Sequence, residues 1–183
     1  MSDDLAVLAA DSAADAQMYL DTVTSVASGD APDAAIPMSL LALSQVLVMG
    51  ARLGAIHDIV LEERFEPDGP EPELDPLRVN LARLFEGLDD YADLVDPVTS
   101  AELSTGSLSN DLTVVAGALA HGLVHHREGR IAEALWWWQF SYLSDWGERA
   151  AMALRVLQGL LAHIRLDADD DLVAEAEFDA LHP

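Results

Sequence analysis

The stretch of residues 130–157, RIAEALWWWQFSYLSDWGERAAMALRVL, constrains the fold more than any other part of the chain. It holds all four tryptophans of the protein, Trp136, Trp137, Trp138 and Trp146, in a sequence that is only 6% aromatic. Tryptophan buries a large area per residue, so a segment that gathers the tryptophans is expected to form the core. At 100° per residue its apolar positions surround a helix almost completely, which is typical of a helix covered on several sides. The sequence therefore predicts a buried helix at the centre of the domain.

Glu133 and the tripeptide Asp145-Trp146-Gly147 interrupt this apolar segment. Glu133 lies one turn before Trp137, so we expect its carboxylate to be exposed at a groove, paired with an arginine or desolvated in the core. For the tripeptide two interpretations are open. Either Gly147 kinks the helix, or Asp145 caps a second helix that begins near Trp146.

The same segment resembles the signature of a known family. The run Glu133-Ala-Leu-Trp-Trp-Trp-Gln-Phe-Ser-Tyr142, then Asp145-Trp-Gly147 and Ala153-Leu-Arg-Val-Leu157, is similar to the pattern of the domain of unknown function 5063 family. Residues 40–45 resemble that family's second helix, and Asn110-Asp111 with Gly122-Leu123 resembles the helix before the signature. The resemblance implies a bacterial, all-helical, cytoplasmic protein of unknown function, and it implies no reaction.

Helical spacing of apolar residues and turn signals predict the other elements of a single domain over residues 1–166. The predicted fold class is all-α, a single-domain bundle of six or seven helices around the tryptophan-rich helix. Around that central helix, helices are expected at 3–27, 37–59, 75–95, 109–127 and 146–165. An acidic loop at 62–76 carries seven acids and four prolines, which exclude a regular element. The acidic C-terminal tail, 167–183, is predicted to form a short helix at 172–181 or to be partly disordered.

The charge of the chain restricts its partners. Thirty-three acidic residues against nine basic ones give a net charge of −24. The resulting field repels nucleic acid and anionic lipid, so neither is an expected partner, whereas a protein with a basic surface is. The chain has no cysteine, which excludes disulfides and thiolate metal sites. Its oligomeric state does not follow from these features.

The second predicted helix has no charged residue from position 34 to position 51. Pro37, Ser39, Ser44 and Gln45 interrupt its apolar pattern, so we expect a core helix and not a membrane span. Gly50 and Gly54 lie one turn apart, and this spacing suggests close approach to another helix. The opening sequence MSDDLAVLAAD lacks the basic segment of a signal peptide, so none is expected, in agreement with the cytoplasmic location that the resemblance implies.

His121 and His125 are the residues most capable of binding a metal. They stand four apart on a predicted helix, and two histidines at this spacing can bind one ion, with His57 as a possible third ligand. The competing interpretation is hydrogen-bonded or solvated histidines near a helix end, where the dipole favours them. We expect no cofactor, with a divalent metal such as zinc as the alternative.

No catalytic motif accompanies this core, so we expect a non-enzymatic interaction or scaffold module. The candidate binding residues are Glu133, Trp137, Phe140 and Arg149, with Glu133 and Arg149 brought together if the chain folds back at Gly147. The alternative is a metal-dependent helical-bundle enzyme that uses the three histidines.

Overall fold

The structure is a computed structural model, and it describes residues 3–61, 72–94, 99 and 101–166. Its elements, in chain order, are α1 (Asp3–Ala27), the 3-10 turn η1 (Pro32–Ala34), α2 (Ala35–Ala55), α3 (Asp75–Leu84), β1 (Asp90–Leu94), β2 (Leu103–Ser107), α4 (Leu108–Arg127), α5 (Ile131–Ser141), the π-helical segment η2 (Tyr142–Trp146) and α6 (Gly147–Leu166). The predominantly helical fold is thus confirmed, with one small antiparallel sheet added.

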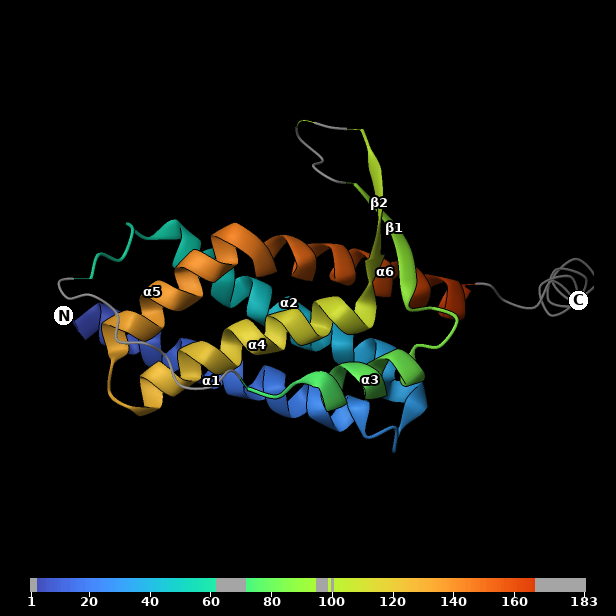
Figure 1. Cartoon of the computed structure of the whole chain (residues 1–183), viewed down its shortest axis with the longest axis horizontal. Helices are drawn as coiled ribbons and strands as arrows, with labels where there is room; N and C mark the ends of the chain where they lie inside the picture. The colour runs from blue at the N-terminus through green and yellow to red at the C-terminus, as the bar shows by residue number, and fades with distance from the viewer. Residues whose placement is uncertain (1–2, 62–71, 95–98, 100, 167–183) are drawn as a thin grey trace, which may run out of the picture.

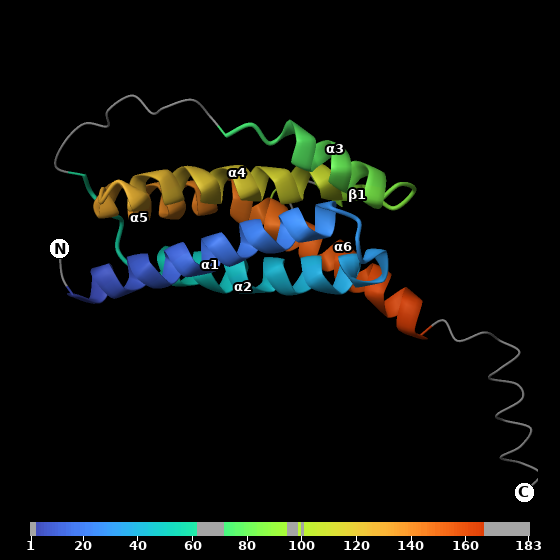
Figure 2. The same cartoon turned by 90° about the horizontal axis from the view of Figure 1, so that it is seen from below.

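The helices pack in two layers. In Figure 2, α1 and α2 lie side by side in one layer, and α4 and α5 form the other, with α3 resting on α4. α6 crosses from the second layer to the first, where it packs along α2 (Figure 2). The hairpin of β1 and β2 projects away from the bundle at one side (Figure 1). The two layers therefore enclose the core, and α6 joins them.

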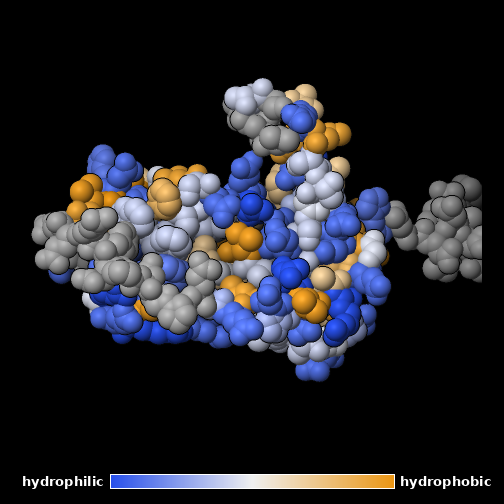
Figure 3. Space-filling view, viewed as in Figure 1, coloured by the Kyte–Doolittle hydropathy of each residue, from blue (hydrophilic) through white to orange (hydrophobic). Residues whose placement is uncertain are grey.

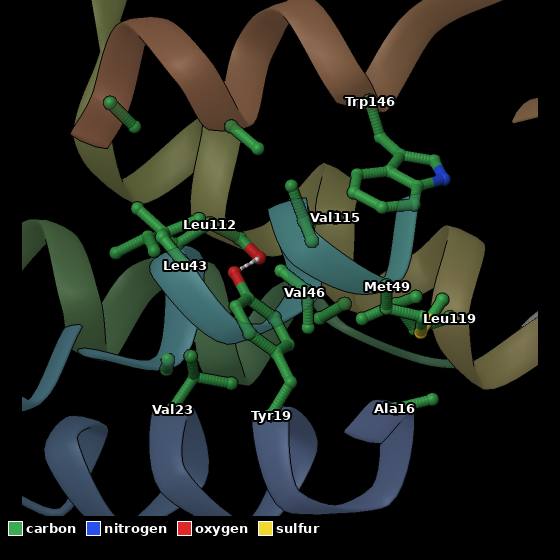
Figure 4. Packing of buried hydrophobic residues seen from close by; sticks show 14 of the residues in the cluster. Ala16, Tyr19, Val23, Leu43, Val46, Met49, Leu112, Val115, Leu119 and Trp146 are labelled. Carbon is green, nitrogen blue, oxygen red and sulfur yellow. Dashed lines mark hydrogen bonds between the residues drawn. The ribbon is translucent and has the colours of Figure 1, made fainter. Parts of the chain in front are cut away.

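The core lies between the layers. Figure 4 shows Tyr19 of α1 pointing between α2 and α4, and Trp146 reaching toward the same cluster from the opposite side. Both side chains are fully buried. The Tyr19 hydroxyl donates a hydrogen bond to the Leu112 carbonyl oxygen at 3.0 Å, which satisfies its one buried polar atom. A tyrosine at the centre of the core thus links α1 to α4 directly.

We expect Tyr19→Phe to reduce the free energy of unfolding by about 1 kcal/mol, because it removes one buried hydrogen bond and leaves the ring in place. Urea denaturation, with the slope held constant between the two proteins, measures this change. A variant as stable as the wild type would show that the hydroxyl contributes nothing to the junction of α1 and α4.

The tryptophan-rich helix does not end at Trp146. Residues Ile131–Leu166 form one uninterrupted helix, in which the Gly147 amide donates to the Tyr142 carbonyl and closes a π-helical turn. Figure 1 shows the bend at this point. Counted this way the described residues contain five helices, α1, α2, α3, α4 and α5–α6, so the prediction of six or seven was wrong. Asp145 caps no new helix and the chain does not reverse at Gly147, because the π turn joins α5 to α6 as one continuous, bent helix.

Gly50 of α2 lies directly under this π turn. A β-carbon at Gly50 would overlap the rings of Tyr142 and Trp146. The close approach predicted for the glycines of the second helix is therefore confirmed, and it is the bent part of α5–α6 that makes it.

The third predicted helix was too long. It ends at Leu84 instead of 95, and residues Asp90–Leu94 pair with Leu103–Ser107 as an antiparallel hairpin in which Tyr91 faces Gly106. The Tyr91 ring covers the α-carbon of Gly106, where any side chain would overlap it. Asp89 stabilises the base of the hairpin, since its carboxylate accepts bonds from the Ser107 hydroxyl and the Ser109 amide at 2.9 and 2.7 Å.

Residues Pro32–Ala55 are long and apolar enough to cross a membrane by length and composition. In the fold, the inner side of α2 packs against α1 and α6, and its outer side is exposed. Most of the predicted 62–76 loop and the whole 167–183 tail lie outside the described residues.

Candidate functional site

The three consecutive tryptophans of α5 have different environments. Trp138 is fully buried and donates to the Leu119 carbonyl at 3.2 Å, and Trp137 is half-buried and donates to the Ala118 carbonyl at 2.9 Å. Both bonds attach α5 to α4. Trp136 points elsewhere and stacks on Phe140, with ring centroids 5.0 Å apart and planes inclined by 6°. Two of the three indoles therefore hold the bundle together, while the third forms part of the surface.

The histidines of α4 lie against the start of α5. The His121 ring packs on Trp137 with centroids 4.1 Å apart, and the rings of His121 and His125 are 5.1 Å apart. His125 is fully buried, with its Nδ1 3.0 Å from Oε2 of Glu133. Arg130 donates to the same carboxylate oxygen at 2.9 Å. Glu133 is thus paired both with an arginine and with a buried histidine.

Gln139 connects α5 to the segment that follows α2. Its side chain is buried, with Nε2 donating to the Leu53 carbonyl at 2.9 Å, and Oε1 accepting from the Ile59 amide at 2.9 Å. The His57 carbonyl lies 3.4 Å from the same Nε2. One buried amide therefore places residues 56–61 along the outside of α5, and these residues form a wall with a cleft on each side.

The first cleft, which we call the aromatic cleft, has a cavity volume of about 520 Å³ and lies between this wall and the exposed side of α5. Trp136, Phe140 and Leu143 line it from α5, and Val60 lines it from the wall. Phe140 is 51% exposed and Val60 is 83% exposed, which is unusual for large apolar side chains placed side by side. In Figure 3, hydrophobic atoms gather at the upper left, where the wall and α5 lie in Figure 1.

The second cleft, which we call the polar cleft, has a volume of about 860 Å³ and lies between the same wall and the start of α5. Its polar lining consists of His57, Asp58, Arg130 and Glu133, over an apolar floor that includes Leu135. Arg130 donates to the Glu133 carboxylate, which also lies beside His125, so the charges of Arg130 and Glu133 neutralise each other in the cleft.

A second polar cluster lies at the base of the hairpin, around the buried carboxylate of Asp111. Its two oxygens are bound by the Tyr91 hydroxyl and by Arg149 Nη1, the latter at 3.2 Å. Burial raises the pKa of Asp111 above its ordinary value, more than the bonds from Tyr91 and Arg149 lower it. Burial, followed by the bond to Asp111, raises the pKa of Tyr91 in turn. With both oxygens occupied, the cluster is a structural joint between the hairpin, α4 and α6.

The predicted binding residues fall into two groups. Glu133, Trp137 and Phe140 all lie on α5, but Arg149 belongs to the Asp111 cluster, where it also donates to Asp145 at 2.7 Å. The predicted pairing of Glu133 with Arg149 was therefore wrong. Sixteen residues of continuous helix separate the two by about 24 Å along its axis. Their partners are Arg130 and His125 for Glu133, and Asp111 and Asp145 for Arg149.

The metal ligands offered by the sequence are not assembled either. His57 is exposed on the wall, whereas His121 and His125 lie between α4 and α5. Across residues 3–61, 72–94, 99 and 101–166, no group of three His, Asp or Glu side chains is arranged to hold a metal ion.

Sequence reasoning missed Gln139 and the wall that it holds. A glutamine in the middle of an apolar helix is a signal, because a buried amide must find partners for its donors and acceptor. It also missed Asp111, which lies in the first turn of α4 and looks like an ordinary helix-start acid.

The fold and these clefts define a class, a predominantly α-helical bundle with a projecting hairpin and surface clefts beside α5. Residues 3–163 match the family described as domain of unknown function (DUF5063). The chain therefore belongs to that family, as the tryptophan segment indicated. No curated protein matches it.

Among solved structures, protein BF1032 from Bacteroides fragilis is similar, with a TM-score of 0.66 at 15% sequence identity. The match covers 82% of this chain and 89% of that one. At this identity the likeness establishes a shared fold.

Proposed function

We propose that the protein is a non-enzymatic, cytoplasmic interaction module whose aromatic cleft binds a segment of a partner protein with cationic and apolar side chains. The observation that carries this proposal is the half-buried Trp136 stacked on the exposed Phe140, beside the exposed Val60 and Leu143, in one cleft. Four apolar side chains that do not join the core, gathered at one concave site, are typical of a recognition surface.

The chemistry of the cleft favours a partner with arginine or lysine side chains. The face of an indole or phenyl ring attracts cations through its quadrupole, and a stacked pair presents a broad face of this kind. Asp58 lines the same cleft, and the net charge of −24 attracts basic segments from a distance. The apolar neighbours Val60 and Leu143 would accommodate aliphatic side chains next to the cation.

Gln139 prepares this cleft for binding. Because its amide holds residues 56–61 in place, the cleft is formed without the partner, and preformed sites lose less entropy on binding. Gln139 contacts the wall from beneath, so it acts as a positioning residue.

A peptide of alternating arginine and leucine is a suitable probe, with tryptophan fluorescence and calorimetry as readouts at near-physiological salt, where non-specific attraction is screened. We expect Phe140→Ala to weaken its binding by about three- to tenfold, the equivalent of one cation–π contact. Val124→Ala, which shortens an exposed apolar residue on α4, is the matched control and should bind normally.

A peptide of alternating glutamate and leucine should not bind. Equal losses for Phe140→Ala and Val124→Ala, or equal binding of the acidic peptide, would contradict the proposal.

A further inference from the structure

The outer side of α2 is an exposed apolar stripe that the proposed function does not use. Met38, Leu41 and Val48 are exposed along it at helical spacing, Leu41 to 64%, with the small residues Ser44 and Ala51 between and beyond them. These positions face away from the buried side of α2 that packs on α1 and α6. We call these five residues the α2 stripe. Its length of about 20 Å is well beyond a single exposed side chain.

The polar groups of the stripe are already satisfied within the chain. The Ser44 hydroxyl donates to the Leu40 carbonyl of its own helix at 2.8 Å. The adjacent Gln45 amide turns toward α1 and donates to Asp15 at 2.9 Å. Removing water from this face would therefore leave no new unsatisfied donor, so the usual cost of burying polar groups is small here.

The charge distribution indicates which partner fits. Residues 34–51 carry no charge in a chain whose net charge is −24. Two copies of such an acidic molecule repel each other over most of their surface, and the repulsion is least where neither presents a carboxylate. A basic partner would instead be drawn to the acidic surfaces, and an anionic membrane would be repelled. A neutral, apolar face on this molecule is therefore best matched by the same face of a second copy.

The spacing of the stripe is self-complementary. In two helices packed antiparallel about a two-fold axis, residues whose numbers have a constant sum lie opposite each other. With the axis beside Ser44 and Gln45, Leu41 lies opposite Val48 of the other copy, and Met38 lies opposite Ala51. Large side chains thus meet smaller ones along the contact, and the small Ser44 lies at the centre, where the helices approach most closely.

We infer that the α2 stripe is a homodimer interface in which the α2 helices of two copies pack antiparallel around Ser44. The contact buries Leu41 twice, once from each copy. Any substitution in the stripe therefore changes the free energy of dimerisation twice, once from each copy. A single introduced charge brings two like charges together.

Sedimentation equilibrium from about 1 µM to about 1 mM covers the dissociation constants of weak and moderate homodimers. We expect the wild type to reach twice the monomer mass, and Leu41→Glu to weaken the dimer by at least about a hundredfold. Leu103→Glu introduces the same charge at an exposed leucine of β2 and is the matched control, which should dimerise as the wild type does. Equal thermal melts of the two variants would show that folding is intact.

Cysteine cross-linking tests the geometry, because the natural chain contains no cysteine. Under an added disulfide oxidant, Ser44→Cys should form a covalent dimer across the axis. Ser144→Cys is the control, since that serine also bonds the carbonyl four residues earlier, at 2.7 Å, on an exposed helix surface. Leu41→Cys alone should cross-link poorly, because its two copies would be about 10 Å apart along the helices, beyond disulfide reach. A mixture of Leu41→Cys and Val48→Cys proteins should cross-link efficiently.

The alternatives give distinct results. A wild type that stays monomeric through the whole range, or a dimer equally sensitive to Leu41→Glu and Leu103→Glu, would overturn the proposal. Efficient cross-linking of Leu41→Cys with itself would replace the antiparallel arrangement with a parallel one. Co-flotation of a monomeric wild type with phosphatidylcholine vesicles, abolished by Leu41→Glu, would assign the stripe to a lipid surface instead.

Discussion

Trp138→Ala is expected to lower the free energy of unfolding by about 3–5 kcal/mol, the largest effect of any single truncation on α5. Trp138 is fully buried, its indole donates to the Leu119 carbonyl, and its ring fills the space above Gly122, where a β-carbon would overlap it. Alanine leaves a cavity between α4 and α5 and removes this hydrogen bond. At a few degrees per kcal/mol for a domain of this size, the melting temperature should fall by about 10 °C.

Trp136→Ala is the matched control, because it removes the same side chain two positions earlier on the same helix. Trp136 is only half-buried and stacks on Phe140 at the surface, so we expect a loss of about 1–1.5 kcal/mol. Differential scanning calorimetry compares the two variants directly. Equal losses of unfolding free energy in the two variants would mean that Trp136 and Trp138 contribute equally to stability, contrary to their different burial.

Arg149→Met should destabilise the protein by about 2–3 kcal/mol near pH 8, because it leaves the Asp111 carboxylate buried without its cation. This is less than for a fully buried pair, since the Arg149 side chain is 43% exposed. The destabilisation should also shrink on acidification. The pKa of Asp111 in the folded protein is already raised above 3.8, and loss of Arg149, which lowers it, raises it further.

The direction of this pH dependence follows from proton binding. When the folded-state pKa is raised, the folded protein holds a proton that the unfolded chain has lost, so acid favours the folded state and rising pH removes this contribution. The contribution of Asp111 to stability is complete below about pH 4, its pKa in the unfolded chain. It decreases as the pH rises and is lost once the pH passes the raised pKa of the folded state. Urea denaturation from about pH 8 to about pH 5 measures the free energy of unfolding of variant and wild type. The difference between the two at each pH removes the contribution of the other acids.

Arg155→Met is the matched control for this series, because Arg155 is exposed on the same helix. It should cost little at any pH. A destabilisation by Arg149→Met that grows on acidification, or that Arg155→Met reproduces, would exclude the assigned role of Asp111.

The tryptophan-rich helix could be predicted from sequence because its signal is strong and local, but its position at the buried centre was wrong, since Phe140 is 51% and Leu143 is 62% exposed. Trp138 and Trp146 have no place except a core, and the small residue Gly50 marked the surface against which the helix packs. The resemblance of the tryptophan segment to the family was confirmed, since the family model matches residues 3–163.

The hairpin could not be predicted, because its stability comes from distant contacts. Tyr91 continues the helical spacing of the preceding leucines, and Ser104 to Ser107 is polar enough to be taken for a turn. What makes both segments strands is the bond from Tyr91 to Asp111 on α4, the packing of Tyr91 on Gly106, and the Asp89 carboxylate that joins the two ends. None of these contacts has a periodicity in the sequence.

The candidate site was predicted only in part for a related reason. Phe140, which lines the aromatic cleft, was among the predicted binding residues, whereas Trp137 bonds α5 to α4. The course of the chain after Trp146 decides which side chains Arg149 can reach. A π turn depends on one extra residue between two helical hydrogen bonds, and no residue type specifies it. The predicted grouping of His57 with His121 and His125 does not occur for a similar reason. His57 lies on the wall, where its carbonyl accepts from Gln139 at 3.4 Å, and no local sequence signal places it there.

The π turn at Tyr142–Trp146 also has a consequence for how this family can diverge. Each turn of this kind accommodates one residue more than an α-helical turn, so it rotates everything downstream by about 100°. Ala150, Ala153 and Leu157 meet the core only in that rotated frame. A relative that lost a single residue between positions 142 and 146 would keep a straighter helix but point this whole row toward solvent. An insertion or deletion here therefore requires the apolar positions of α6 to shift along the sequence. Sequence alignments should treat the helical periodicity before and after the π turn separately.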